Sequence, residues 1–231
     1  MAPLAPHILY EDNHIIVAVK PAGTPSQGDI SGDEAILDTL KDYVKTSKQK
    51  PGEAFLGLLH RLDRPVGGVM VFARTSKAAG RLSEQFRKRT VKKAYLAVVE
   101  GTPPEEKGEL RHFLIKDEQA NRTKASLREI AGAKPAILEY EVVARHPMYT
   151  LLKVILHTGR SHQIRAQLSA VGCPIVGDLK YGSSTTTDGK SIALWSYLLT
   201  VVHPTLKEEM TFTAPPSGVF PWDMFDLLAL M

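Results

Sequence analysis

The chain has 231 residues, 43% of them hydrophobic, and a formal net charge of +4, values typical of a globular protein of one large domain or two small ones. No run of about 18 apolar residues suits a membrane helix, and the N-terminus lacks the basic and apolar regions of a secretory signal. The single cysteine, Cys173, excludes an intrachain disulfide and argues against a zinc site. We therefore expect a reducing compartment: the cytoplasm fits best, and an organelle matrix is also compatible.

Short apolar runs and amphipathic segments define the elements expected along the chain. Ile15–Val19 is a β-branched run typical of a buried strand. Apolar residues recur at helical spacing in three segments, and Ser76 and Ser161 stand where they could cap the second and third of these helices. In chain order we predict strand 15–19, helix 33–45, strands 56–59 and 69–73, helix 76–89, strands 94–99, 109–115, 136–144 and 150–156, a helix from 161 to about 171, strands 194–202 and 209–213, and a short helix after Pro221.

Strands outnumber helices in this series and do not alternate strictly with them. Such a pattern favours an α+β fold with a mixed sheet over a doubly wound α/β fold. Between two of the predicted strands, Arg61–Gly68 contains a proline and paired glycines, which indicates a tight, exposed loop. A polar loop is expected at 45–52, where the composition changes to lysine, serine, proline and glycine.

Positive charge is concentrated in one stretch of the chain. Residues 74–93 contain eight basic residues and one acidic residue, Glu84. A solvated helix face explains such a run in most proteins, whereas a phosphate-binding surface is the functional alternative. The basic residues are Arg74, Lys77, Arg81, Arg87, Lys88, Arg89, Lys92 and Lys93.

Several common chemistries lack their sequence signatures. There is no glycine-rich phosphate loop and no dinucleotide fingerprint after the first strand, so no nucleotide cofactor is expected. The Gly-x-Ser-x-Gly nucleophile elbow is also missing. His157 and His162 are five residues apart, which places them on different helix faces, so we expect no metal site. A glycosidase needs two facing carboxylates, and the loop at Asp63 offers one.

Three polar positions remain as candidates for chemistry. Asp63 is a lone acid between Arg61 and Arg64, and taken alone this arrangement is most often a structural turn aspartate. The segment Arg160–Arg165 stands at a predicted helix start, where it is typical of a helix cap but also of phosphate or carboxylate binding. Tyr95 lies within an apolar strand, where a core tyrosine and a site residue are equally expected.

Four blocks in the same order resemble the RluA-type pseudouridine synthases. Residues 60–75, His-Arg-Leu-Asp-Arg-Pro-Val-Gly-Gly followed by Val-Met-Val-Phe-Ala-Arg-Thr, resemble the signature loop of that family. Lys93–Gly101 resembles its tyrosine strand, and His157–Arg165 and Gly177–Gly182 resemble its third and fourth blocks. Weaker similarity covers nearly the whole chain, including Asp12-Asn13-His14 and Lys20-Pro21-Ala22-Gly23.

The resemblance implies a fold as well as a reaction. The expected architecture is the pseudouridine synthase fold, with a mixed, largely antiparallel central sheet flanked by helices and an active-site cleft across the sheet. Residues 1–231 are expected to form a single catalytic domain, without the small N-terminal RNA-binding domain that many relatives carry. One departure is Gly67, where the family usually has serine or threonine, so that a hydroxyl that could brace the loop is missing.

The implied reaction is the isomerisation of uridine in RNA to pseudouridine, on a nucleotide flipped out of the RNA, and it needs no cofactor. Asp63 would be the catalytic carboxylate, either attacking the ribose or acting through a glycal. Arg160 would pair with Asp63 and favour its ionised form. Tyr95 would stack on the flipped base and could serve as a general base. Arg61 would contact the RNA backbone or fill the gap that the nucleotide leaves.

The implied partner is ribosomal or transfer RNA, and the chain is expected to be a monomer. With an RNA substrate, the basic stretch becomes a phosphate-binding surface. One alternative is a non-catalytic RNA-binding or ribosome-assembly protein with the same fold; another is a hydrolase of a nucleoside or sugar phosphate, which would not need the basic stretch. The residues expected to bind RNA are Arg61, Arg64, Lys77, Arg81, Arg87, Lys88, Lys92, Lys93, His162 and Arg165.

Overall fold

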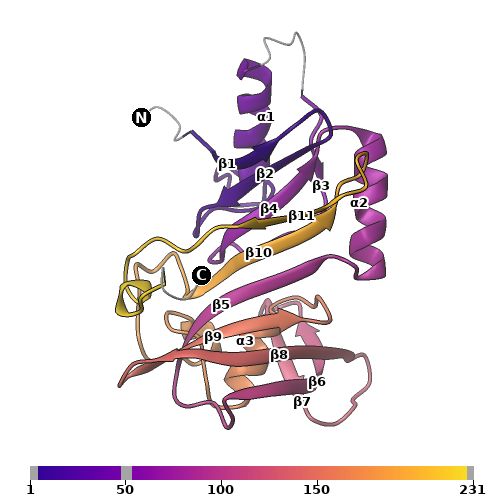
Figure 1. Cartoon of the computed structure of the whole chain (residues 1–231). Helices are drawn as coiled ribbons and strands as arrows, with labels where there is room; N and C mark the ends of the chain where they lie inside the picture. The colour runs from indigo at the N-terminus through magenta and orange to yellow at the C-terminus, as the bar shows by residue number, and fades with distance from the viewer. Residues whose placement is uncertain (1–4, 48–53, 228–231) are drawn as a thin grey trace. The chain divides into compact units, whose positions relative to one another are not determined.

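The structure, a computed structural model, describes residues 5–47 and 54–227 and is drawn in Figure 1. It divides into two compact units. The first comprises the chain up to Lys93 together with Ser196–Ala214, and the second comprises Ala94–Trp195 and the chain from Pro215 onward. Most of the polar loop expected at 45–52 lies outside the described residues.

The first unit is built on a sheet in which the strands follow the order β1-β2-β4-β10, with β3 paired to β4 and β11 paired to β10. Every residue of β2 and of β4 is buried, so these two strands form the centre of the unit. Their antiparallel register places Val17 opposite Val71. The strands are β1 (His7–Glu11), β2 (Ile15–Lys20), β3 (Gly57–Leu58), β4 (Gly67–Ala73), β10 (Leu194–Val202) and β11 (Glu209–Thr213).

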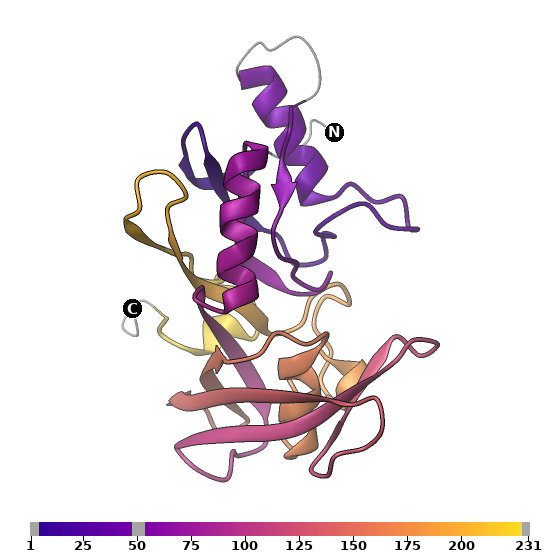
Figure 2. The ribbon, with the colours of Figure 1, turned by 90° about the vertical axis from the view of Figure 1, so that its right-hand side faces the viewer.

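Two amphipathic helices complete this unit. α1 (Ile36–Ser47) begins three residues later than predicted and buries one residue per turn. α2 (Ser76–Lys88) packs against β3 and β4, and Figure 2 shows α2 and β3 side by side. The prediction that Ser76 caps α2 is wrong, because the hydroxyl of Thr75 accepts the hydrogen bond from the backbone N–H of Ala78 at 3.1 Å.

Side chains of α2 also bind the backbone at the end of β10. Gln85 Nε2 donates to the carbonyl of Val202 at 2.7 Å, and the N–H of Val202 donates to Gln85 Oε1 at 2.9 Å. One turn earlier, Arg81 Nη1 donates to the carbonyl of Pro204 at 2.8 Å. The amide of Gln85 satisfies both backbone groups of Val202, as a neighbouring strand would, and so fixes α2 against the β10–β11 hairpin.

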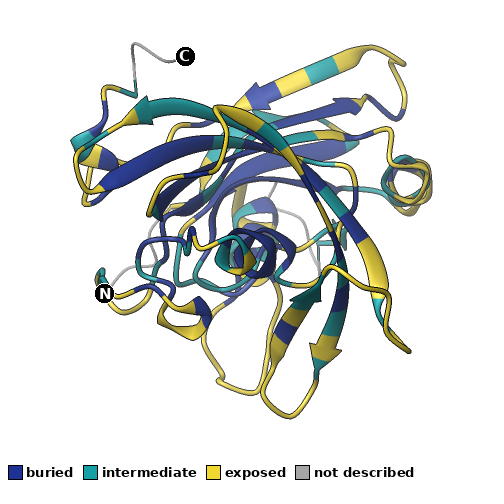
Figure 3. Cartoon of the chain, turned by 90° about the horizontal axis from the view of Figure 1, so that it is seen from below, coloured by how far each residue is buried: buried dark blue, intermediate teal, exposed yellow. Residues whose placement is uncertain are grey.

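The second unit contains an antiparallel sheet in the order β5-β9-β8-β6-β7. α3 contacts β6 and β7. Buried residues lie along the strands and exposed residues gather in loops and hairpin ends, as Figure 3 shows. The elements are β5 (Lys92–Glu100), β6 (Lys107–Asp117), β7 (Arg122–Ser126), β8 (Lys134–Arg145), β9 (Tyr149–Leu156), α3 (Gln163–Ala170) and the 3-10 turns Leu179–Tyr181 and Trp222–Met224.

The α+β class predicted from the sequence is confirmed, since antiparallel strand pairs dominate and helices do not alternate with strands. Two further details of the prediction are wrong. Ser161 does not cap α3. The residue before the helix is His162, whose backbone is left-handed with a φ of 51° and whose side chain makes no capping hydrogen bond. Gly67 and Gly68 belong to the buried strand β4 and not to the exposed loop. The sequence also gave no indication of β1 or β7, of which β7 is short and polar.

Candidate active site

Asp63 lies in a short turn that leads into β4. Its neighbours Leu62 and Val66 are 6% and 2% exposed, whereas Asp63 and Arg64 are partly exposed. The N–H of Val66 donates to the carbonyl of Asp63 at 3.0 Å and closes the turn. The turn is therefore anchored by apolar side chains on both sides of the acid while the acid itself remains within reach of solvent.

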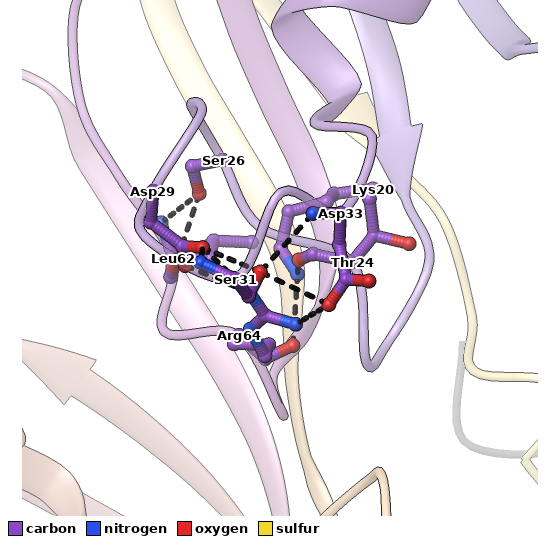
Figure 4. Close-up of polar contacts among 8 residues, drawn as sticks. All are labelled: Lys20, Thr24, Ser26, Asp29, Ser31, Asp33, Leu62 and Arg64. Carbon is purple, nitrogen blue, oxygen red and sulfur yellow. Dashed lines mark hydrogen bonds and ion pairs between the residues drawn. The ribbon is translucent and has the colours of Figure 1, made fainter.

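Ser26 holds the residue before Asp63. Its hydroxyl donates to the carbonyl of Leu62 at 2.8 Å and accepts from the N–H of Leu62 at 3.0 Å. Ser26 is 5% exposed, so both bonds are shielded from competing water. Figure 4 shows this contact together with those of Lys20 and Arg64. A single side chain thus fixes both backbone groups of the residue that precedes the acid.

Lys20 holds the residue after Asp63. Its side chain is fully buried, and its ammonium donates to the carbonyls of Pro21, Thr24 and Arg64 at 3.0, 2.6 and 3.2 Å. Burial lowers the pKa of Lys20 to about 7, partly offset by the nearby charge of Asp63. Three carbonyl acceptors match the three donors of an ammonium, so the geometry suits the charged form.

The sequence did not identify Lys20 or Ser26 as site residues. The local signals were a lysine at the end of a fully apolar strand, followed by proline, and the weak family resemblance of Lys20-Pro21-Ala22-Gly23. Both residues act on a loop about forty positions away, at separations of 36 residues for Ser26 to Leu62 and 44 for Lys20 to Arg64. Local periodicity carries no information about contacts of that range.

His60 is held as a neutral imidazole. The backbone N–H of Val71 donates to its Nε2 at 3.2 Å, and its ring stacks on Phe86 with the centroids 4.9 Å apart. Burial lowers the pKa of His60 to about 3, and the charge of Lys93 acts in the same direction. An Nε2 that accepts a hydrogen bond requires the proton on Nδ1. His60 therefore anchors the start of the Asp63 loop to β4 and α2.

Arg64 was predicted to bind RNA, and its guanidinium is already engaged within the protein. Nη2 donates to both carboxylate oxygens of Asp29, at 2.9 and 2.8 Å, and to the hydroxyl of Ser31 at 2.5 Å. Nη1 forms an ion pair with Asp33. Figure 4 shows the four side chains converging.

The other cations expected to bind RNA in the first unit differ in their surroundings. Arg61 and Lys77 are exposed. Lys93 is partly buried, and burial lowers its pKa. The remaining members contact protein groups: Arg81 binds the carbonyl of Pro204, Arg87 and Lys88 pair with Glu84, and Lys92 pairs with Glu209. The basic stretch is a row of partly neutralised charges, and its role in RNA binding stays a prediction.

Tyr95 and Arg160 belong to the second unit, and Asp63 belongs to the first. Tyr95 is 7% exposed and stands in β5 opposite Val154 of β9. The backbone N–H of Arg160 donates to Gln163 Oε1 at 3.0 Å, and its Nε donates to the carbonyl of Pro135 at 3.2 Å. The predicted pairing of Arg160 with Asp63, and the approach of Tyr95 to it, stay predictions.

Arg165 and His162 are part of a buried polar cluster around Tyr181. Arg165 is 6% exposed and forms two hydrogen bonds to the 1% exposed Asp178, at 2.6 and 2.9 Å. The hydroxyl of Tyr181 lies 2.9 Å from His162 Nδ1 and accepts from the N–H of Thr123 at 2.7 Å. This burial favours a structural role for Arg165 over the predicted RNA contact, because a phosphate would have to displace a bidentate carboxylate.

Glu100 organises the loop Ser183–Thr185 in the second unit. Its carboxylate accepts hydrogen bonds from the hydroxyl of Ser183 and from the backbone N–H groups of Ser184 and Thr185 at 2.7, 3.0 and 2.9 Å. Burial raises the pKa of Glu100, but these hydrogen bonds outweigh it and lower the pKa to about 2. The ionised carboxylate therefore accepts the backbone hydrogen bonds that a neighbouring strand or helix would accept, and this loop has no regular structure.

Because the folded-state pKa of Glu100 is depressed, its contribution to stability is present above the ordinary glutamate pKa and is lost as pH falls toward 2. We expect Glu100→Gln to lower the unfolding free energy at pH 7 by about 1 kcal/mol after allowance for solvent screening, and by nearly nothing at pH 2. Urea unfolding of both proteins across this range measures the difference. Glu118→Gln, at an exposed acid beside Lys116, is the control. If Glu100→Gln lowered the unfolding free energy by the same amount at every pH, the stabilising role of the ionised Glu100 carboxylate would be contradicted.

Within residues 5–47 and 54–227, no group of three or more His, Cys, Asp or Glu side chains is arranged to hold a metal ion. In the same part of the chain, every helix is too short or too polar to cross a membrane.

Comparison with known proteins identifies relatives over nearly the whole chain. Residues 14–170 match the family model described as RNA pseudouridylate synthase. The chain is 38% identical to the dual-specificity RNA pseudouridine synthase RluA of Escherichia coli, over 90% of this chain and 92% of that protein. It is 33% identical to ribosomal large subunit pseudouridine synthase D of Neisseria meningitidis, matching 99% of this chain but spanning only 62% of that relative's length.

Solved structures give the same result for the fold. The human RNA pseudouridylate synthase domain containing 4 superposes with a TM-score of 0.75 at 27% identity, over 90% of this chain and 88% of that one. The human RNA pseudouridylate synthase domain containing 1 also superposes with a TM-score of 0.75, at 24% identity. The pseudouridine synthase fold implied by the four sequence blocks is confirmed, and the chain belongs to the RNA pseudouridylate synthase family.

Proposed function

We propose that the chain isomerises specific uridines in ribosomal or transfer RNA to pseudouridine. The observation that carries the proposal is the turn at Asp63. Hydrogen bonds from Ser26 and Lys20 hold the residues on both sides of a partly exposed carboxylate. A catalytic carboxylate must keep its position while its oxygens stay accessible to substrate, and this turn meets both needs. The relatives, which are named as RNA pseudouridine synthases, agree with such an activity.

In this proposal Asp63 acts on a uridine that has been flipped out of the RNA. The carboxylate either attacks the ribose or removes its proton to give a glycal. The base is released from its nitrogen linkage, turned, and rejoined to the ribose through carbon. Tyr95 stacks on the flipped base, and Arg160 pairs with Asp63 and stabilises its ionised form. Arg61, exposed two residues before Asp63, contacts the RNA backbone or fills the gap in the stack.

Residues 1–231 are proposed to act as one catalytic domain with an active-site cleft that receives the flipped nucleotide. The exposed cations of α2 would contact phosphates around it. Raising the salt concentration should therefore weaken RNA binding. We further propose that the protein acts as a monomer in the cytoplasm and without a cofactor. The phosphate contacts rest on the exposure of residues such as Lys77 and Arg81, the compartment rests on the single cysteine, and the lack of a cofactor rests on the missing sequence signatures and the family resemblance.

The proposed function is tested in two steps. Base-resolution pseudouridine mapping of total RNA from cells with and without the gene should reveal one or more sites that are lost with it. The purified chain should then restore pseudouridine at the same site when it is added to the unmodified RNA. If mapping shows no lost site and the purified chain binds RNA without modifying it, the non-catalytic alternative replaces this proposal.

A further inference from the structure

An exposed turn, Asp29–Asp33, is attached to the residue that follows Asp63. All five of its residues are exposed, and the side chain of Ile30 at its tip is fully open to solvent. Ser31 is bonded to Asp29 and Asp33 within the turn. The three polar side chains of the turn all bind one guanidinium, that of Arg64 (Figure 4).

The charges in this group are matched to each other. One guanidinium contacts two carboxylates and a hydroxyl through both of its Nη atoms. Hydrogen bonds from Ser31 and Arg64 lower the pKa of Asp29 to about 2, and those from Arg64 and Ser31 also lower the pKa of Asp33. Isolated exposed ion pairs contribute little to stability, but several charges fixed in one network are an exception to that rule.

Arg64 is held at its backbone as well as at its side chain. Its carbonyl accepts hydrogen bonds from the N–H of Gly23 at 2.8 Å and from Lys20 Nζ at 3.2 Å. Because the backbone of Arg64 continues directly from Asp63, fixing Arg64 at both ends removes rotational freedom from the carboxylate's own backbone. The cost of a misplaced catalytic group is high, since a shift of about 1 Å can reduce a rate about 100-fold.

The same contacts count against Arg64 as a ligand of RNA. Its guanidinium is shared between two carboxylates, so a phosphate would have to displace at least one of them. Asp29 and Asp33 stand in front of it and would repel the phosphate. Arg61, which is exposed and lies on the other side of Asp63, has no acid of this turn as partner within the described residues.

We infer, on the basis of the proposed function, that Arg64 is a positioning residue for Asp63 and that the Asp29–Asp33 turn is its anchor, a role that replaces the RNA contact expected from the sequence. The anchored guanidinium holds the turn of Asp63 in the geometry needed for turnover. Its loss should therefore reduce kcat, whereas loss of a phosphate ligand would raise KM and weaken the salt dependence of binding.

Three variants of the full chain test this inference: Arg64→Ala, the double variant Asp29→Asn with Asp33→Asn, and the combination of all three changes. We expect the first two each to lower kcat about 10- to 100-fold while KM stays unchanged. The combination should be no worse than either, because all three changes break one network. The double variant Asp29→Asn with Asp33→Asn gives the most decisive comparison. If the two acids did not position Arg64, removing two negative charges from an RNA enzyme should improve substrate binding and leave kcat unchanged.

Arg111→Ala is the matched control, because Arg111 is also an exposed arginine paired with an acid, Glu109. It should leave kcat unchanged. Hydrogen exchange supplies a readout that does not need turnover: the amides of Val66 and Gly23, bonded to the carbonyls of Asp63 and Arg64, should exchange faster in the variants.

Two results would overturn the inference. One is a raised KM with unchanged kcat in Arg64→Ala, accompanied by a lowered KM in the double variant, which would make Arg64 an RNA ligand. The other is unchanged exchange at Val66 and Gly23 in all three variants. If the wild-type chain makes no pseudouridine on any RNA, the proposed function fails, and the exchange result still decides whether Arg64 fixes the turn.

Discussion

Replacing Asp63 by asparagine should reduce pseudouridine formation by about 10³-fold or more, because an amide can neither attack the ribose nor accept its proton. Asparagine keeps the size of the side chain, and the turn is held by Ser26, Lys20 and Val66 through backbone groups that the change leaves intact. Folding and RNA affinity should therefore be preserved. Nucleoside analysis of RNA incubated with each protein measures the loss.

The control for this experiment is Asp117→Asn, which removes an acid from the β6–β7 hairpin of the second unit. Its turnover should equal that of the wild type. Normal turnover by Asp63→Asn would show that the carboxylate is not needed for the reaction, and loss of RNA binding by the same variant would show that the carboxylate contributes to binding.

Replacing Gly68 by alanine should destabilise the first unit by about 3 kcal/mol or more. Gly68 has a φ of 124°, a conformation that residues with a side chain rarely adopt. A Cβ there would lie closer than 3.0 Å to backbone atoms of Ser196 in β10. Backbone atoms of a paired strand cannot move aside as a flexible side chain can, and a loss of this size is a large share of the stability of a typical domain.

Urea unfolding measures this effect, and Gly80→Ala is the matched control. Gly80 lies inside α2, where nothing stands within 4 Å of an added Cβ. That change should raise the unfolding free energy by about 0.5–1 kcal/mol, since alanine favours the helix and glycine does not. An unchanged urea midpoint for Gly68→Ala would mean that β10 accommodates the methyl group without cost.

Local patterns in the sequence were sufficient for most of the secondary structure. The bounds expected for the last two strands, 194–202 and 209–213, agree with β10 and β11. The class of fold followed from the order of elements. The polar strand β7 could not be predicted from the sequence, because it has one buried residue in five and no alternation of apolar side chains.

The acid of the candidate site could be named from the sequence, but the residues that hold it could not. Asp63 stands in a recognisable block, whereas Ser26, Lys20 and Asp29 bond to its neighbours Leu62 and Arg64 from positions 35 to 44 residues away, through contacts that only the folded chain creates. Sequence reasoning also did not reveal the acidic partners of Arg64 and Arg165, whose expected RNA contacts are untested. Each is an arginine in a family block, and each finds an acidic partner elsewhere in the chain.

In the proposed complex with RNA, the contact between Gln85 and Val202 would lower the entropy cost of binding. A surface helix that could rock on its sheet would lose that freedom when phosphates bound to it, and the loss would weaken the complex. α2 is held at two points one turn apart, by Arg81 at Pro204 and by Gln85 at Val202. The helix is therefore already in place before the proposed RNA binds, so that ordering it would cost little free energy.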